Sequence, residues 1–438
     1  MNNTGFLKPT KLASVAEVIF SNVDKLSSPG EIQVRLCNYT DVYYNRRIDS
    51  RLQFKTATAT PREIKRFHLL AGDVVITKDS ESANDIAVPA YVAEDIPDLV
   101  CGYHLAILRP KNGILDGRFL SQLLQLHHTR QYFATLANGV TRFGLGTDAI
   151  NKAQIRLPNV AIQRKIADIL TLWDETLEKL DALIAAKERR KKALMQQLLT
   201  GRKRLKGFTG KWRIQELGAV VTPNSRPVPK PAKPFLAAGI RSHGRGVFLK
   251  PDFNPSEIAL DELFQLRTND LVVNITFAWE GALAIVPPEA DGALVSHRFP
   301  TFQCEKNKAA LGFIRHIIRT KRFVFECGLA SPGGAGRNRV LSKNAFLNIA
   351  VSLPSFAEQT AIANILGTCD EELRLLRAQR DTIDQQKRGL MQRLLTGKVR
   401  VNSAETKTDN DKRGHTNNGN ELGGARRRRA CLATDCIR

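Results

Sequence analysis

The sequence has few of the features that mark an exported, membrane-bound or metal-binding protein. Its 438 residues contain no apolar run of the roughly 18 residues that a membrane-spanning helix needs. The first residues, MNNTGFLKPT, lack the basic and then apolar pattern of a signal peptide. Seven cysteines are scattered along the chain, with none in a CxxC pair or at zinc-ligand spacing from a histidine. We therefore expect a cytoplasmic protein with reduced thiols and no bound metal.

Motifs of catalysis are also scarce. No P-loop is present, which argues against an ATP motor in this chain. The glycine stretches GLG (144–146) and GGAG (333–336) are too short for an S-adenosylmethionine loop, and VPPEA (286–290) lacks the flanking residues that grip a flipped base. Asp49, Glu63 and Lys65 have the residue types of a metal-dependent nuclease, but such triads are common by chance. We expect no catalysis here and keep a self-contained nuclease as an alternative.

Charge of one sign is abundant. There are 66 Lys and Arg against 43 Asp and Glu, which gives a net charge of +23 and a pI near 9.9. Such an imbalance indicates a polyanionic partner, most often nucleic acid. The excess is spread along the chain, which favours a long contact track over one pocket. A basic soluble protein without such a partner is the simpler alternative.

One segment occurs twice. LMQQLLTG begins at Leu194 and LMQRLLTG begins at Leu390, 196 residues later. At this offset residues 157–201 align without a gap on residues 353–397, and 21 of the 45 positions are identical. The chain is therefore an internal duplication, in which a globular segment and a long helix are followed by a second globular segment and a second helix.

Both copies predict a long helix with a narrow apolar seam. Apolar residues step alternately by four and three, as in a heptad repeat, and the helix from Ile162 to Leu199 would be roughly 57 Å long. A single seam needs a partner, and the natural partner is the other copy in an antiparallel pair. Four basic residues interrupt the seam and either specify its register or leave it. They are Lys187, Lys191, Arg380 and Lys387.

The globular segments, called here the first head (1–156) and the second head (212–352), show similar orders of features. AGDVVITKDS (71–80) and TNDLVVNITF (268–277) each predict a turn and a buried strand, and each head ends in a short strand before Leu-Pro. We predict an α+β fold with pseudo-two-fold duplication. Its helices occupy 157–200 and 353–396, a basic linker occupies 201–211, and a basic tail that we expect to be disordered occupies 397–438.

These residues resemble the specificity subunit of type I restriction–modification enzymes. The resemblance covers about residues 5–400. Its most specific carriers are LPxxAxQxxIAxIL…DE…LMQxLLTG, present twice, together with GIRSHGRGVFLKPDFNP (239–255) and NITFAWEGALAIVPPEADGALVSHRFPTF (274–302). The first head is a weaker match, and its role comes from its place in the duplication.

The resemblance implies a function and a set of partners. The two heads would be target-recognition domains that each bind one half of a split, asymmetric DNA sequence, and the paired helices would set the spacing between the halves. Two DNA methyltransferase subunits would dock on the helices, followed by motor–nuclease subunits. S-adenosylmethionine, ATP and Mg²⁺ would be bound by those partners, with no cofactor in this chain. Gln163, Gln359, the acidic pairs at 174–175 and 370–371 and the LMQ tips at 194–196 and 390–392 are candidates for the docking surface, because the duplication offers the same surface twice.

Candidate DNA contacts are basic and amide side chains in predicted loops, because such groups hold phosphates and recognise base edges. Trp279 is more often a core residue than a stacking platform. A coiled-coil scaffold with basic heads and no sequence preference is a further alternative. The predicted DNA-binding residues are Asn45, Arg46, Arg47, Arg51, Lys78 and Arg142 in the first head, and Arg241, His243, Arg245, Asn274, Thr276, Arg337, Asn338 and Arg339 in the second.

Overall fold

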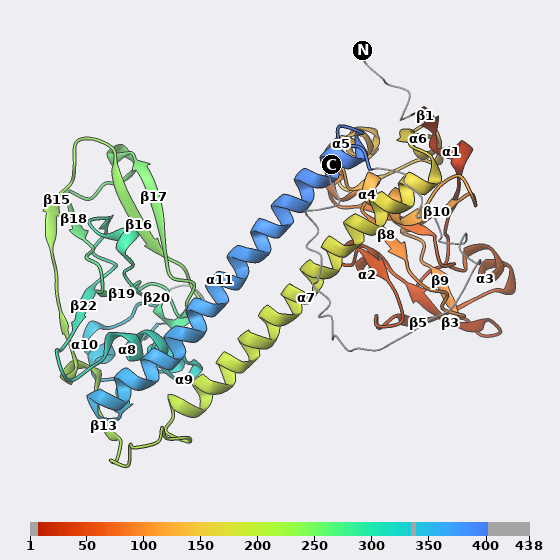
Figure 1. Cartoon of the computed structure of the whole chain (residues 1–438). Coiled ribbons are helices and arrows are strands. Elements are labelled where there is room, and N and C mark those ends of the chain that lie inside the picture. Colours follow the sequence, from red (N-terminus) through yellow and green to blue (C-terminus); the bar gives the residue numbers. More distant parts are fainter. Residues whose placement is uncertain (1–7, 334–338, 402–438) are drawn as a thin grey trace, which may run out of the picture. The chain divides into compact units, whose positions relative to one another are not determined.

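The computed structural model describes residues 8–333 and 339–401 and has mixed α and β content. The chain divides into two compact units, one formed by residues up to 179 together with those from 380 onward, and one formed by residues 180–379. Each unit therefore contains one head and a part of each long helix, α7 (Val160–Leu198) and α11 (Phe356–Leu395) (Figure 1). The predicted tail from 402 lies outside the described residues.

The first head is built on a five-stranded sheet of order β2-β10-β6-β8-β4, accompanied by a three-stranded sheet of order β5-β3-β9. The loop at 102–104 separates β9 from β10. The elements are β1 (Lys8–Lys11), α1 (Leu12–Val15), β2 (Ala16–Phe20), β3 (Ile32–Cys37), α2 (Tyr39–Tyr43), β4 (Arg47–Ile48), β5 (Lys55–Ala59), α3 (Pro61–Phe67), β6 (Val74–Thr77), β7 (Asp79–Ser80), η2 (Ala83–Asp85), β8 (Pro89–Val92), β9 (Leu99–Cys101), β10 (Leu105–Pro110), α4 (Gly117–Leu124), α5 (His127–Leu136), β11 (Phe143–Gly144), α6 (Thr147–Asn151) and β12 (Gln154–Leu157).

The central strands of this sheet are buried on both faces. In β6, Val74 and Ile76 belong to one apolar cluster, which includes residues of α4, α7 and α11, while Val75 belongs to another, which includes residues of the smaller sheet. Side chains alternate between the faces of a strand, so an uninterrupted apolar run fits a sheet that is covered on both sides.

The second head contains a four-stranded sheet of order β14-β22-β19-β20 and a five-stranded sheet of order β15-β18-β21-β16-β17. The elements are β13 (Arg213–Glu216), η3 (Leu217–Ala219), β14 (Val221–Pro223), β15 (Pro227–Pro229), β16 (Phe235–Ile240), β17 (Val247–Phe253), η4 (Pro255–Glu257), β18 (Glu262–Gln265), β19 (Leu271–Val273), η5 (Ala278–Glu280), β20 (Leu283–Ile285), η6 (Pro288–Ala290), β21 (Leu294–Val295), β22 (Thr301–Cys304), α8 (Leu311–Ile317), α9 (Lys321–Leu329), α10 (Lys343–Leu347) and β23 (Ala350–Leu353).

Each long helix is fastened to its head by a buried glutamine. The Gln163 side chain accepts a hydrogen bond from the amide of Asp116 and donates to the carbonyl oxygens of Ile114 and Pro158. Gln359 repeats this arrangement, accepting from the amide of Ala310. Both glutamines are 1% exposed. The prediction that they form a docking surface is therefore wrong, and their recurrence has a structural cause, because an unsatisfied buried polar group is costly.

Within each unit, parts of both long helices pack together. In the first unit the buried residues Ile162, Ile166 and Leu170 of α7 share an apolar cluster with Met391 and Leu394 of α11. In the second unit Ile362 and Leu366 of α11 share a cluster with Leu198 and Leu199 of α7. Apolar positions of the predicted seam near the ends of both helices are therefore buried, whereas those nearer the middle, such as Trp173, Ile184 and Ile383, are half-buried.

Three basic residues of the seam, Lys187, Lys191 and Lys387, pair with acids of the other long helix within their own unit. Lys387 is 1% exposed, and its Nζ lies 2.7 Å from Oδ1 of Asp174. Burial opposes the charge of Asp174, but Lys387 and Arg46 outweigh it and hold the pKa of this carboxyl below its usual range. In the second unit Lys191 pairs with Asp370 at the equivalent positions. Each helix thus supplies an aspartate and, 17 residues later, a lysine.

No helix in the described ranges, 8–333 and 339–401, is long and apolar enough to cross a membrane.

Candidate nucleic-acid interface

In the second head, the segment after β19 forms a tight turn whose shape depends on Asn274. Its Oδ1 accepts a hydrogen bond from the amide of Thr276, and its own backbone amide donates to the carbonyl of Ala282. Asn274 is 8% exposed. It therefore shapes the turn, and Thr276 is the more accessible of these two predicted contacts.

Trp279 lies on η5 at the centre of this turn and carries a cation on its ring. Its Nε1 donates to the Thr276 carbonyl at 3.1 Å, and the Arg339 guanidinium lies 5.6 Å from the ring centroid. Arg298 donates to Oγ1 of Thr276 at 3.3 Å. Trp279 is thus half-buried, with Arg339 over its ring, and the same turn binds Arg298 through Thr276.

The loop 241–246 is fastened onto the same turn. The amide of His243 donates to the Glu280 carbonyl, that of Gly244 donates to the Gly281 carbonyl, and His243 adopts a positive φ of 61°. Arg319 packs closely against Gly244, since a Cβ at that glycine would lie 3.3 Å from Cγ of Arg319. Backbone contacts therefore place this loop, the turn and α9 beside one another.

Together these elements form what we call the second-head cationic surface. The sequence predicted three of its five arginines but missed Arg298 and Arg319, which lie far from the others along the chain. Arg241 stacks on Phe248 at 5.3 Å, and Arg245 is exposed. Arg337 and Asn338 lie outside the described residues. The surface comprises Arg241, Arg245, Arg298, Arg319 and Arg339 with Trp279.

In the first head, three of the predicted arginines are already held by carboxylates. Arg46 lies 2.6 Å from Asp174 of α7, while Arg47 and Arg51 both contact the buried Asp49. Hydrogen bonds from Arg51 hold the pKa of Asp49 below its usual range. A phosphate would have to replace these partners, so the stretch 45–51 is less suited to DNA than its composition predicted. Asn45 donates to the backbone carbonyl of Asp41.

The other two predicted residues of the first head lie near an aromatic cluster. The Nζ of Lys78 is 5.5 Å from the centroid of the Phe20 ring and 3.3 Å from Asp79. Arg142 donates to the ring of His104, whose pKa is lowered chiefly by burial. Arg142 and His104 share a cavity of about 460 Å³ with the stacked rings of Tyr39 and Tyr43 and with Tyr44, which is 76% exposed. Such groups can stack on bases and hydrogen-bond to their edges.

The acidic residues of the alternative nuclease site have other roles. Asp49 binds arginines, and Glu63 completes the capping box of α3 by accepting hydrogen bonds from Thr60. In the described part of the chain, no three His, Cys, Asp or Glu residues gather as metal ligands would. The geometry therefore gives the nuclease alternative no support.

In sequence the chain is similar to specificity subunits of type I restriction enzymes. Residues 10–188 match the family model described as "Type I restriction modification DNA specificity domain". The putative type I restriction enzyme MjaX specificity subunit of Methanocaldococcus jannaschii is 24% identical over 77% of this chain and 81% of its own length. The MjaVIII specificity subunit of the same organism is 24% identical over 67% of this chain and 73% of its own.

Solved structures share the fold. The type I restriction–modification system S subunit from M. genitalium matches with a TM-score of 0.56 and 14% identity, covering 90% of this chain and 97% of that one. A chain from a study of complex assembly and conformational transition in the type I R-M system matches with a TM-score of 0.51 and 14% identity, covering 89% and 97%. The family model, the curated relatives and the M. genitalium structure all represent type I restriction–modification specificity subunits or domains, and this chain is similar to them in sequence and fold.

Proposed function

We propose that this protein is the non-catalytic, sequence-specific DNA-binding subunit of a type I restriction–modification complex. It recognises a bipartite, asymmetric target, with one half-site bound by each head. The observation that carries the proposal is the contrast between like helices and unlike heads. The helices share 21 of 45 residues, including a repeated aspartate–lysine set, whereas the candidate DNA surfaces are an arginine set around Trp279 in one head and tyrosines with Arg142 in the other.

The helix pair supports a second part of the proposal. In the second unit the contacts of Lys187 with Glu372 and of Lys191 with Asp370 run antiparallel, since the partner number falls as the α7 number rises. We propose that α7 and α11 form one antiparallel coiled coil that fixes the spacer between half-sites. Removing one heptad from each helix would then shorten the spacer and leave both half-site sequences unchanged.

Partners supply the chemistry in this proposal. Two methyltransferase subunits dock on the duplicated framework, motor–nuclease subunits join them, and these partners carry S-adenosylmethionine, ATP and Mg²⁺. Gln163, Gln359, Asp174 and Asp370 are engaged within the chain. Of the other two repeated acids, Glu175 is half-buried, and Glu371 is exposed and pairs with Arg374 one turn later on the same helix. Purified protein incubated with DNA and Mg²⁺ should leave the DNA intact; cutting by the chain alone would revive the nuclease alternative.

The direct test is selection of bound DNA from a random library by the purified chain in complex with its methyltransferase subunits. The proposal predicts enrichment of one split motif of two different halves. Enrichment of no motif, with binding that random DNA competes away fully, would support the non-specific scaffold instead.

A further inference from the structure

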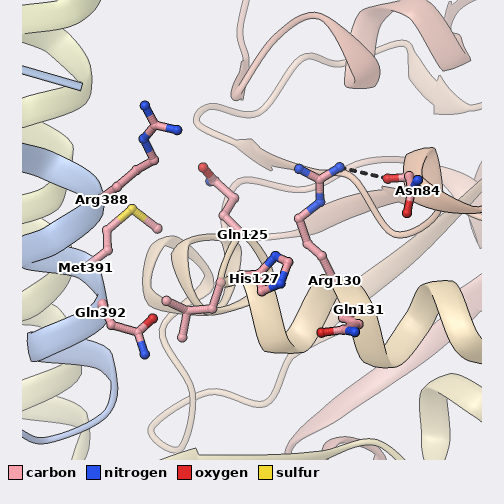
Figure 2. Close-up of a pocket in the computed structure, with 9 residues that line it drawn as sticks. Asn84, Gln125, His127, Arg130, Gln131, Arg388, Met391 and Gln392 are labelled. Atoms are coloured by element: carbon pink, nitrogen blue, oxygen red, sulfur yellow. Dashed lines mark hydrogen bonds between the residues drawn. The ribbon is translucent and has the colours of Figure 1, made fainter. Parts of the chain in front are cut away.

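A second basic feature of the first unit lies outside the predicted DNA contacts. A cavity of about 560 Å³ opens between α5, η2 and the last turns of α11. Figure 2 shows Arg388 and Met391 of α11 on one side, facing Gln125, His127 and Arg130 on the other. Of the nine described residues that line it, none carries a carboxylate. They are Asn84, Gln125, Leu126, His127, Arg130, Gln131, Arg388, Met391 and Gln392.

The two arginines of this cavity are available to an anion. Arg130 donates to the backbone carbonyl of Asn84 at 2.8 Å, a neutral partner that leaves its charge uncompensated. Arg388 is 72% exposed and pairs with Asp384 one turn earlier on the same helix, at 2.9 Å. A surface pair of this kind contributes little to stability. Either guanidinium can therefore exchange its present partner for a phosphate, with which it forms stronger, two-pronged hydrogen bonds.

The backbone adds donors of the same kind. Leu126, which lines the cavity, is the N-cap of the ten-residue helix α5, and its side chain cannot cap the first amides of that helix. Amides at a helix N-terminus favour an anion. Carboxamides of Gln125, Gln131 and Gln392 complete a lining of hydrogen-bonding groups.

The second copy retains a part of the basic character of this site. The helix offset of 196 matches Arg388, Met391 and Gln392 with Lys192, Met195 and Gln196. In the heads the offset is 194, as the amides of Asp116 and Ala310 that bind the two glutamines show, and it matches His127 with Lys321. A basic residue therefore recurs in the second copy at the positions of both Arg388 and His127, whereas Val324 stands at the position of Arg130.

We infer that this cavity binds a phosphate group of the DNA backbone beside the first half-site, with Arg130 and Arg388 as its principal ligands. The inference rests on the proposed function and gives the repeated Met-Gln of the helix tips a role. Because one arginine comes from the head and the other from α11, the bound strand would contact both elements. Phosphate contacts fix the register of a protein on DNA without recognising bases.

The test is the salt dependence of DNA binding by the full chain in complex with its methyltransferase subunits. Each lost phosphate contact lowers the slope of log K against log salt by about 0.9. Arg130→Gln and Arg388→Gln should each lower this slope by that amount, on target DNA and on random DNA alike. Each should also weaken DNA binding by about tenfold. Arg164→Gln, at another exposed arginine on a long helix of the first unit, is the matched control and should change neither quantity.

Three results are distinguishable. A reduced slope in both variants, with Arg164→Gln like the wild type, supports the site. An unchanged slope in both variants overturns it, and the thermal unfolding temperature of Arg388→Gln confirms that this exposed substitution leaves the fold intact. Calorimetric titration with inorganic phosphate tests whether the cavity takes free phosphate instead of DNA. Phosphate binding by the wild type alone, with DNA binding unchanged in both variants, overturns the DNA backbone as the ligand in favour of free phosphate. The proposed function is refuted separately if the wild-type complex binds target DNA no more tightly than random DNA. The salt slope on random DNA tests the phosphate site in that case as well.

Discussion

The buried lysine of the first unit allows a quantitative prediction about the paired helices. Lys387 is 1% exposed and Asp174 is its ion-pair partner at 2.7 Å. Asp174→Leu leaves an ammonium group buried beside the guanidinium of Arg46, and loss of one partner of a buried pair costs about 3–5 kcal/mol. Lys387→Met should cost less, about 1–2 kcal/mol, because Asp174 retains Arg46 at 2.6 Å and Gln122 at 2.7 Å.

The second copy supplies a matched control for this prediction. Lys191 and Asp370 occupy the equivalent positions, but their side chains are 15% and 39% exposed, so water screens the charge that Asp370→Leu would leave. That substitution should cost about 1–2 kcal/mol. The double variant Asp174→Leu with Lys387→Met should be nearly as stable as the wild type, since it removes both charges together.

The assay is urea unfolding of the full chain, followed by far-UV circular dichroism, with hydrogen exchange used to assign each transition to a unit. The double-mutant cycle should give a coupling of about 4–7 kcal/mol, close to the sum of the two single losses. Equal losses for Asp174→Leu and Asp370→Leu would refute the claim that burial of the lysine sets the cost. A double variant as unstable as the sum of its parts would refute the pairing itself.

Three further predictions concern the second unit. Gln359→Leu should destabilise it by about 2–3 kcal/mol in urea unfolding, because the amide of Ala310 loses its buried partner; a loss below 0.5 kcal/mol, on the order of an exposed substitution, would contradict this role. Burial lowers the pKa of His316 to about 4. The neutral ring therefore contributes fully to the free energy of unfolding above about pH 6.5, and this contribution falls by at most about 3 kcal/mol as the pH drops towards 4. His316→Gln, which introduces the residue found at the equivalent Gln122, should flatten that pH dependence, and an unchanged profile would exclude His316 as its source. Arg245→Gln should weaken DNA binding by about 1 kcal/mol or more in a fluorescence titration, and wild-type affinity would remove this arginine from the interface.

Much of the framework was predictable because it depends on patterns that repeat. The heptad steps and the gap-free duplication predicted both helices, which the structure places at Val160–Leu198 and Phe356–Leu395. The roles of individual polar residues were harder to predict. Gln163 and Gln359 recur because each joins a helix to its head, not because they face a partner. The sequence signal for this role is their position five residues after Pro158 and Pro354, whose carbonyl oxygens they bind.

The candidate DNA surfaces were predicted in part, for a related reason. Sequence shows the loop that carries Arg241 and Arg245, but not that Arg319 packs against it. Nor does local sequence reveal that Asp174, more than 120 residues away, neutralises Arg46. Long-range packing decides which cations keep a free charge, and no local pattern encodes it.

The most direct test of the central claim is a base-resolution map of DNA methylation. Cells that express this chain with the methyltransferase encoded beside it are compared with cells that express the methyltransferase alone. The proposal predicts a split, asymmetric methylated motif only when this chain is present. Methylation that is identical in the two cells, while this chain and the methyltransferase form a stable complex, would contradict the claim that this chain selects the target.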